Sequence, residues 1–259
     1  MTPTDTPAAQ AAAGDDLARA LRLTTLSLAF GRVERATRHE DGRRPETDTD
    51  HTVMLALVAC ELAPPGLDRA KIAAFALVHD LPEVHAGDTQ TLVISPEATA
   101  AKRDREDAAR ARLTAELGAG SWVASTLAAY EQQRVPEARF VRAVDKVLPK
   151  LTHAFNGCAA ARALTDRAGF VEAHRRQLRT LREEYPEFPD VLELLRASMV
   201  HSEACWSDDA PTGDDLFGRL YAASNHGGDT TTLATGDVRG VVHAMQATDE
   251  RIAHLESEC

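Results

Sequence analysis

The sequence predicts an all-α protein. Apolar residues recur at intervals of three and four along most of the chain, which is the spacing of one buried helix face. Helix start and stop signals frame these stretches, and no series of alternating strand patterns interrupts them. The chain has 259 residues, of which 44% are hydrophobic and only 5% aromatic. It is long enough to bury a sizeable core, which would consist mainly of Leu, Val and Ala.

Caps and breakers divide the N-terminal half into separate helices. Thr and Asp are favoured at the N-cap, and Pro fits the first helical turn. Leucines at helical spacing mark the first helix, and a Pro-Pro-Gly sequence ends the second. In chain order, we expect a helix over 15–30, a loop over 38–50, a helix capped by Thr49 or Asp50 and stopped at Pro64, a helix from Asp68 to His79, and a short helix after Pro82.

The C-terminal half continues this organisation up to about residue 200. The sequence Ser95-Pro96-Glu97 combines an N-cap residue with a first-turn proline and a first-turn acid. Pro149 is expected to kink or break the helix that contains it. The expected helices cover residues 95–118, 121–133, 136–155, 164–184 and 191–200.

The composition changes at both ends of the chain. Residues 1–14 have no apolar period, so we expect a disordered leader there. Residues 15–200 form the predicted helical domain. Residues 201–259 are acidic, rich in turn residues and only weakly helical, so we expect an appended segment, for which the sequence indicates no role.

Charge and cysteine usage exclude several classes of function. The chain carries 29 Lys+Arg against 40 Asp+Glu, a formal net charge of −11, which argues against nucleic acid or an anionic membrane surface as the partner. No apolar run reaches the roughly 18 residues of a membrane span, and no secretory signal is visible. The four cysteines are widely spaced, which suits reduced thiols in a cytoplasmic protein.

The candidate chemistry centres on a buried His-Asp pair. His79 and Asp80 end an apolar run, where an imidazole and a carboxylate are costly without a partner such as a divalent cation. His51 begins the preceding helix, and antiparallel packing would bring it close to His79. Asp145 borders the apolar stripe of its own helix. Together these residues would make a mixed nitrogen and oxygen set suited to Mn²⁺, Fe²⁺, Co²⁺ or Mg²⁺.

The order of these residues, H…HD…D on an all-α chain, resembles the HD-domain phosphohydrolase superfamily. Three segments resemble its YfbR-like 5′-deoxynucleotidase branch more specifically: PETDTDH at 45–51, HDLPEVHAGDTQT at 79–91 and VDKVLPKL at 144–151. The resemblance covers about residues 20–197. It implies an HD-domain helical bundle that forms a homodimer and acts on a small nucleotide.

The resemblance also implies roles for individual residues. His51, His79, Asp80 and Asp145 would hold one divalent metal ion. Glu83 would handle the proton of the attacking water or of the leaving alcohol. Arg35, or in its place Arg38, would hold the phosphate. The expected substrate contacts are Arg35, Ala36, Asp88, Thr91 and Lys146.

Two departures from the branch concern the substrate. The branch has a Trp after the phosphate-binding Arg, whereas this chain has Ala36. Arg43 and Arg44 add two cations close to the expected site. The choice between ribose and deoxyribose, and the number of phosphates in the substrate, therefore stay open.

The resulting hypothesis is a metal-dependent phosphohydrolase that releases phosphate from nucleotides, with (deoxy)nucleoside 5′-monophosphates as the main substrates. One alternative is a (deoxy)nucleoside triphosphate hydrolase of the same fold, in which Arg43 and Arg44 contact the extra phosphates. A non-catalytic, nucleotide-sensing HD protein is the alternative from another functional class.

Overall fold

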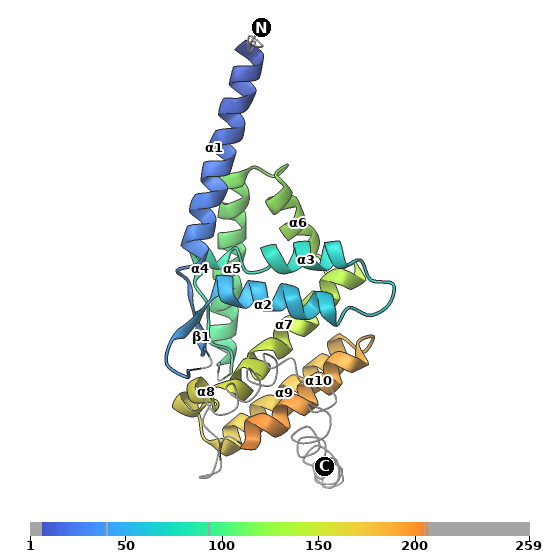
Figure 1. Cartoon of the computed structure of the whole chain (residues 1–259). Helices are drawn as coiled ribbons and strands as arrows, with labels where there is room; N and C mark the ends of the chain where they lie inside the picture. The colour runs from blue at the N-terminus through green and yellow to red at the C-terminus, as the bar shows by residue number, and fades with distance from the viewer. Residues whose placement is uncertain (1–6, 40, 93, 205, 207–259) are drawn as a thin grey trace, which may run out of the picture. The chain divides into compact units, whose positions relative to one another are not determined.

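The structure, a computed structural model, describes residues 7–39, 41–92, 94–204 and 206, and these residues are predominantly helical (Figure 1). They divide into two compact units. The first unit comprises the chain up to Arg35, Glu46–Gln90 and Ile94–Val141, and the second comprises residues 36–45, 91–93 and the chain beyond Val141. The all-α class is confirmed, with one small two-stranded sheet. Among the described helices, none is long and apolar enough to cross a bilayer.

The first unit contains most of the N-terminal helices. Their bounds are α1 (Pro7–Phe30), α2 (Asp48–Glu61), α3 (Arg69–Val78), α4 (Glu83–Ala86), α5 (Pro96–Leu117), α6 (Trp122–Glu131) and the start of α7 (Pro136–Phe155). Figure 1 shows α2 and α3 side by side, and the N-terminal part of α1 extends away from the other helices of this unit. Its core includes residues from α1, α3, α5 and α6, among them Phe30, Val78, Leu113 and Leu127.

The second unit contains the rest of α7, α8 (Ala159–Leu164), α9 (Arg167–Glu184) and α10 (Pro189–Ala204). Phe170, Leu181 and Leu195 are fully buried in it. A small cluster of Cys158, Ala161 and Phe170 packs beside Leu92 and Trp206. Cys60 and Cys158, the cysteines that the structure describes, are thiols rather than disulfide partners.

N-cap residues begin α2 and α3 close to the predicted positions, although α2 starts slightly earlier than expected. Asp68 caps α3, because its side chain accepts hydrogen bonds from the backbone N–H groups of Ala70 and Lys71. Thr47, rather than Thr49 or Asp50, caps α2: its hydroxyl accepts from the N–H of Asp50, whose carboxylate accepts from the N–H of Thr47. This capping box fixes the first turn of α2, which carries His51.

The predicted loop over 38–50 is correct only in its middle, because Arg38 and 45–47 belong to strands and α2 begins at Asp48. The strands β1 (Glu34–Arg38) and β2 (Pro45–Thr47) pair there as a hairpin. Gly42 sits in its turn at φ 66°, and a Cβ on it would lie 3.3 Å from the Cβ of Ala159. Asn156 holds the strand by donating to the carbonyl of Arg38 at 2.7 Å. Such short, polar strands lack the apolar alternation that a sequence pattern requires.

Other boundaries also differ from the predictions. Residues 7–14, expected in a disordered leader, belong to α1, and their alanine-rich sequence has high helix propensity. Pro149 lies inside a continuous α7. The helix expected from residue 164 begins at Arg167, because Asp166 caps it and accepts from the N–H of Gly169. The expected segment 201–259 loses its first residues to α10, and 207–259 lie outside the described residues.

Candidate functional site

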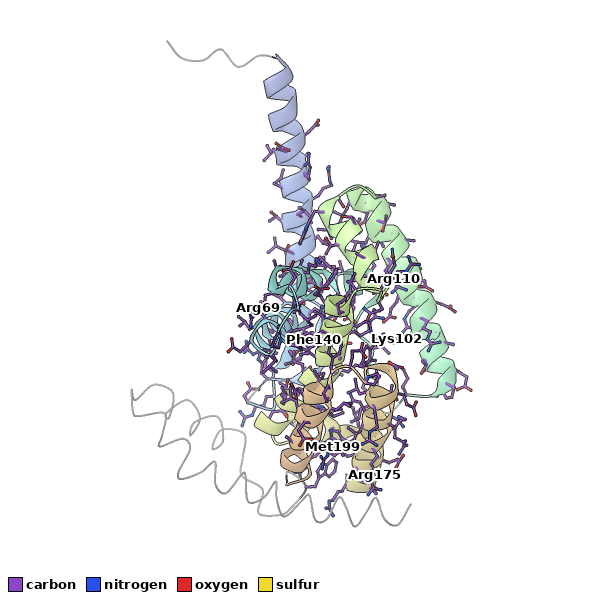
Figure 2. All side chains as sticks on the ribbon, turned by 90° about the vertical axis from the view of Figure 1, so that its right-hand side faces the viewer. Arg69, Lys102, Arg110, Phe140, Arg175 and Met199 are labelled. Atoms are coloured by element: carbon purple, nitrogen blue, oxygen red, sulfur yellow. The ribbon has the colours of Figure 1, made fainter. Side chains whose placement is uncertain are left out.

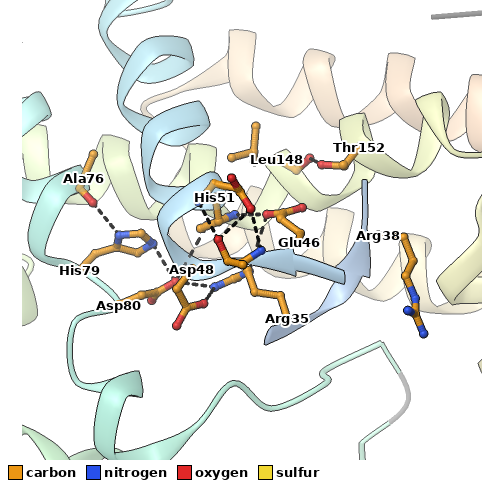
Figure 3. A network of polar contacts seen from close by, with 12 residues as sticks. Arg35, Arg38, Glu46, Asp48, His51, Ala76, His79, Asp80, Leu148 and Thr152 are labelled. Atoms are coloured by element: carbon orange, nitrogen blue, oxygen red, sulfur yellow. Dashed lines mark hydrogen bonds and ion pairs between the residues drawn. The ribbon is translucent and has the colours of Figure 1, made fainter. Parts of the chain in front are cut away.

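His51 is the most deeply placed of the predicted ligands in the first unit. It lies in the first turn of α2 and is 0% exposed. Its Nδ1 lies 3.1 Å from Oε1 of Glu46, which is itself buried on β2 (Figure 3). A carboxylate accepts hydrogen bonds, so this contact keeps the hydrogen on Nδ1 and leaves the lone pair of Nε2 available.

His79 follows α3 and is oriented in the same way. Its Nδ1 donates to the backbone carbonyl of Ala76 at 2.8 Å, which again leaves Nε2 available. The ring centroids of His79 and His51 are 5.5 Å apart, so the expected approach of the start of α2 to the end of α3 is confirmed. The Tyr130 ring packs edge to face against His79, with 6.1 Å between the ring centroids, and this contact helps to fix the His79 ring.

Both imidazoles turn toward the carboxylate of Asp80. Its Oδ2 lies 3.0 Å from Nε2 of His79 and 3.9 Å from Nε2 of His51. One ligand atom from each of these three residues lies within 4.8 Å of the others. Two neutral imidazole nitrogens and one carboxylate oxygen form a donor set that fits a divalent transition metal or Mg²⁺.

Arg35 on β1 joins this site through its guanidinium group. Its Nη1 donates to Oδ1 of Asp48 and to Oδ2 of Asp80, both at 2.8 Å (Figure 3). Oε2 of Glu83 is 3.6 Å from the same nitrogen. The Arg35 side chain is only 11% exposed, so it is held by these carboxylates rather than by water. This position favours Arg35 over Arg38, whose Nη1 donates to the carbonyl of Arg43.

Asp48, Asp80 and Glu83 form a buried group of carboxylates around Arg35. One oxygen from each lies within 4.8 Å of the others. Burial and the charges of Asp80 and Asp48 raise the pKa of Glu83, and burial and Asp80 raise the pKa of Asp48. Arg35 opposes both shifts. A carboxyl group with a strongly raised pKa, such as Glu83, retains its proton near neutral pH and can donate it as a general acid.

The structure places the remaining predicted residues as follows. Asp88 lies in the first unit, half-buried after α4, and its charge contributes to the raised pKa of Glu83. Ala36 and Thr91 are exposed, and Lys146 is half-buried, all in the second unit. Asp145 is also half-buried in that unit, one helical turn beyond Val141 on α7. The roles assigned to these four residues of the second unit stay predictions.

Two residues of this site received no predicted role, although both belong to the PETDTDH segment that carries the resemblance. Glu46 orients His51, and Asp48 shares Arg35 with Asp80. The signal for Asp48 was its position three residues before His51, which places both on one helix face. Lys102 lies on α5 (labelled in Figure 2). Burial lowers its pKa, but its 2.8 Å bond to Glu106 and the charges of Glu83 and Asp80 raise it.

Comparisons with known proteins bear on the family and the fold of the chain. The model of the HD domain family matches residues 31–188, which is more than half of the chain. The chain therefore belongs to the HD domain family. The match spans Arg35, His51, His79, Asp80 and Asp145, including the His-Asp pair after α3.

One solved structure is similar in fold. It is the crystal structure of a predicted metal-dependent phosphohydrolase from Magnetospirillum magnetotacticum MS-1, with a TM-score of 0.54 and 22% sequence identity. The alignment covers 72% of this chain and 97% of the other. No curated protein matches the chain.

Proposed function

We propose that the protein is a metal-dependent phosphohydrolase that releases phosphate from a nucleoside 5′-monophosphate. The observation that carries this proposal is the shared carboxylate of Asp80. Both imidazole Nε2 atoms and the Arg35 guanidinium converge on its Oδ2. A site that pairs metal ligands with an arginine fork fits a phosphate ester, which needs a cation and bidentate hydrogen bonds. The HD family and the phosphohydrolase of similar fold support the same reaction class.

His51, His79 and Asp80 would hold one divalent metal ion, and we propose Asp145 as the fourth ligand. The two buried imidazoles fit this role because Glu46 and Ala76 fix their Nδ1 atoms. A bound divalent ion polarises a phosphoryl oxygen and lowers the pKa of water. The set contains no thiolate, so Mn²⁺, Co²⁺, Fe²⁺ and Mg²⁺ are the ions to test.

Arg35 and Glu83 supply the remaining chemistry from the protein. Arg35 pairs with both Asp48 and Asp80. We propose that its guanidinium also donates to the phosphate of the substrate and fixes the orientation of that group. Glu83, buried beside Arg35 with a raised pKa, would carry the proton between the attacking water and the leaving alcohol.

Asp88, Thr91, Ala36 and Lys146 are the proposed contacts to the rest of the nucleotide. Asp88 has the most direct support, because its charge already acts on Glu83. The small side chain of Ala36 would leave room beside the sugar. The homodimer that the sequence resemblance implies is part of the same proposal, and light scattering of the purified chain would measure it.

The test is a phosphate-release screen on the full chain. Treatment with EDTA, followed by Mn²⁺, Co²⁺ or Mg²⁺, would be combined with AMP, dAMP, ADP and ATP. We expect metal-dependent release from the monophosphates. Release from ATP as pyrophosphate or triphosphate, detected only after pyrophosphatase or polyphosphatase is added, would favour the triphosphate hydrolase. If the protein bound no metal and released no phosphate, the enzyme hypothesis would be wrong, and the nucleotide-sensing alternative would remain.

A further inference from the structure

The second unit buries a group of hydrogen-bond donors outside the candidate metal site. Lys150 and His153 lie three residues apart on α7 and are 7% and 5% exposed. His174 on α9 and Ser202 on α10 are both 0% exposed. Trp206 follows α10 and is half-buried. We call these five residues the donor cluster.

Most polar atoms of the donor cluster have no hydrogen-bond partner among the residues that the structure describes. These atoms are Nδ1 of His153, one ring nitrogen of His174, Oγ of Ser202 and Nε1 of Trp206, and all of them are buried. The other ring nitrogen of His174 bonds to the backbone of Phe170. Buried polar groups are normally paired, and each unpaired one costs free energy. Four such atoms in one unit therefore indicate a binding partner, and those that carry a hydrogen require a partner that supplies acceptors.

Phe170 and Cys158 connect the members of the cluster. The Phe170 ring meets His174 edge to face at 4.3 Å between centroids, and it lies 5.4 Å from the Trp206 ring. Cys158 packs against Phe170, and its Sγ donates to the backbone carbonyl of Ser202 at 3.4 Å. The three helices α7, α9 and α10 thus contribute to one buried region.

The charges show that Lys150 belongs to the same region. Burial and the charge of Lys150 lower the pKa of His174 to about 2 and that of His153 to about 3. Both imidazoles are therefore neutral at pH 7, each with one N–H donor. Burial lowers the pKa of Lys150 itself to about 8, so its ammonium group is still charged at neutral pH.

Within the described part of the chain, no carboxylate forms an ion pair with Lys150. Its pKa is lowered mainly by burial and further by the cation Arg176, and only the sulfur of Cys158 acts in the opposite direction. A buried ammonium without a counter-ion is strongly unfavourable. The positive charge of Lys150 argues against a cation as the ligand of the donor cluster. No three His or Cys atoms of the described residues in this unit lie close enough to share a metal ion either.

We infer that the donor cluster binds a small oxyanion of the class of inorganic phosphate, sulfate or a phosphate monoester group. Lys150 would supply the charge, and the N–H groups of His153 and Trp206 and the hydroxyl of Ser202 would donate to its oxygens. Such an anion satisfies the orphaned donors and the buried cation at once. This inference does not depend on the proposed catalytic activity.

Calorimetric titration of inorganic phosphate into the EDTA-treated full chain tests the inference. We expect saturable binding that Lys150→Met weakens at least thirtyfold and that Ser202→Ala weakens severalfold. Arg179→Met removes a charge from an exposed residue of the same unit and should leave the affinity within twofold. Phosphate held at the metal centre would show the opposite pattern, lost in Arg35→Gln and kept in Lys150→Met, and would overturn the inference.

Thermal unfolding provides a second measurement that does not depend on calorimetry. Phosphate or sulfate should raise the Tm of the native chain, since a ligand that binds only the folded state stabilises it. Lys150→Met should abolish this rise, while the variant itself folds because it removes an unpaired buried charge. Displacement of phosphate by AMP would assign the site to a monoester, and failure of AMP to compete would assign it to the free anion. Absence of saturable phosphate binding in the native chain would refute the inference and leave ordered water as the partner.

Discussion

At the scale of single residues, the orientation of each imidazole decides whether a buried histidine can serve as a metal ligand. Histidine has two possible ligand atoms, and the partner of Nδ1 decides which one is available. In His51 this partner is Glu46, and in His79 it is the carbonyl of Ala76. Because of these two contacts, both histidines present the lone pair of Nε2 toward the same place, where it can coordinate a metal ion.

The contact between Glu46 and His51 leads to a first prediction. Glu46→Ala should lower the metal affinity about 10- to 100-fold, because His51 loses the group that fixes its tautomer and ring. Glu46→Gln is the matched control, since its amide oxygen still accepts from Nδ1, and it should lose much less. Metal content after dialysis against graded chelator measures both. Equal affinities in Glu46→Ala and the native chain would contradict the assigned role.

A second prediction separates Asp80 from Glu83. Asp80→Ala should remove most of the bound metal and the activity together. It deletes the anionic metal ligand toward which both imidazole Nε2 atoms point. Glu83→Gln should keep the metal and lower kcat about 10²- to 10⁴-fold, the range of a lost general acid or base. Elemental analysis and phosphate release measure the two effects. Loss of metal in Glu83→Gln as complete as in Asp80→Ala would contradict this division of roles.

At the scale of elements, the helices were predictable and the hairpin was not. Asp68 and Ser95 cap α3 and α5 as the sequence indicates, since these signals are local. The strands β1 and β2 form because pairing and the fit of Gly42 against Ala159 compensate for weak local preference. Tertiary context of this kind leaves no periodic pattern in the sequence. The hairpin matters because β1 carries Arg35 and β2 carries Glu46.

The same reasoning applies to the candidate site. His51, His79 and Asp80 were found from the sequence because they interrupt or adjoin apolar runs and match a motif. Asp48 was not, because a first-turn acid is equally expected as a favourable charge at a helix N-terminus. Only the fold shows that Asp48 is fully buried against Arg35.

Strand β1 also carries the third prediction, which concerns the sugar. Ala36 is small and exposed next to Arg35, so no bulky side chain at this position crowds a 2′-hydroxyl. We expect kcat/KM for dAMP and AMP to differ by less than about tenfold. Ala36→Trp should raise the preference for dAMP. Neighbouring strand residues alternate in direction, so an unchanged ratio in Ala36→Trp would show that residue 36 does not contact the sugar.

At the scale of the whole molecule, the two units differ in the charges that they bury. The first unit concentrates carboxylates around Arg35, whereas the second buries Lys150, His153 and His174. Three of the four proposed metal ligands belong to the first unit, so chelation is expected to act mainly there. Acidification is expected to destabilise the second unit, because its buried imidazoles resist protonation.

The last prediction concerns this acid sensitivity. Burial lowers the pKa of His174 to about 2 and of His153 to about 3, both below the value of about 6.5 in an unfolded chain. Above pH 6.5 both states are neutral, and the shift costs nothing. Below it the unfolded state binds protons that the folded state does not, so stability falls as the pH falls.

At pH 5.5 each imidazole should cost about 1.4 kcal/mol relative to pH 7.5, and the loss should continue toward pH 3. Denaturant unfolding in phosphate-free buffers, followed by tryptophan fluorescence, measures it. His174→Leu removes one titrating group at similar volume, so its stability should fall only about half as much over this range. If the native chain and His174→Leu showed the same pH dependence, the folded state would protonate His174 as readily as the unfolded state does, which would contradict the lowered pKa.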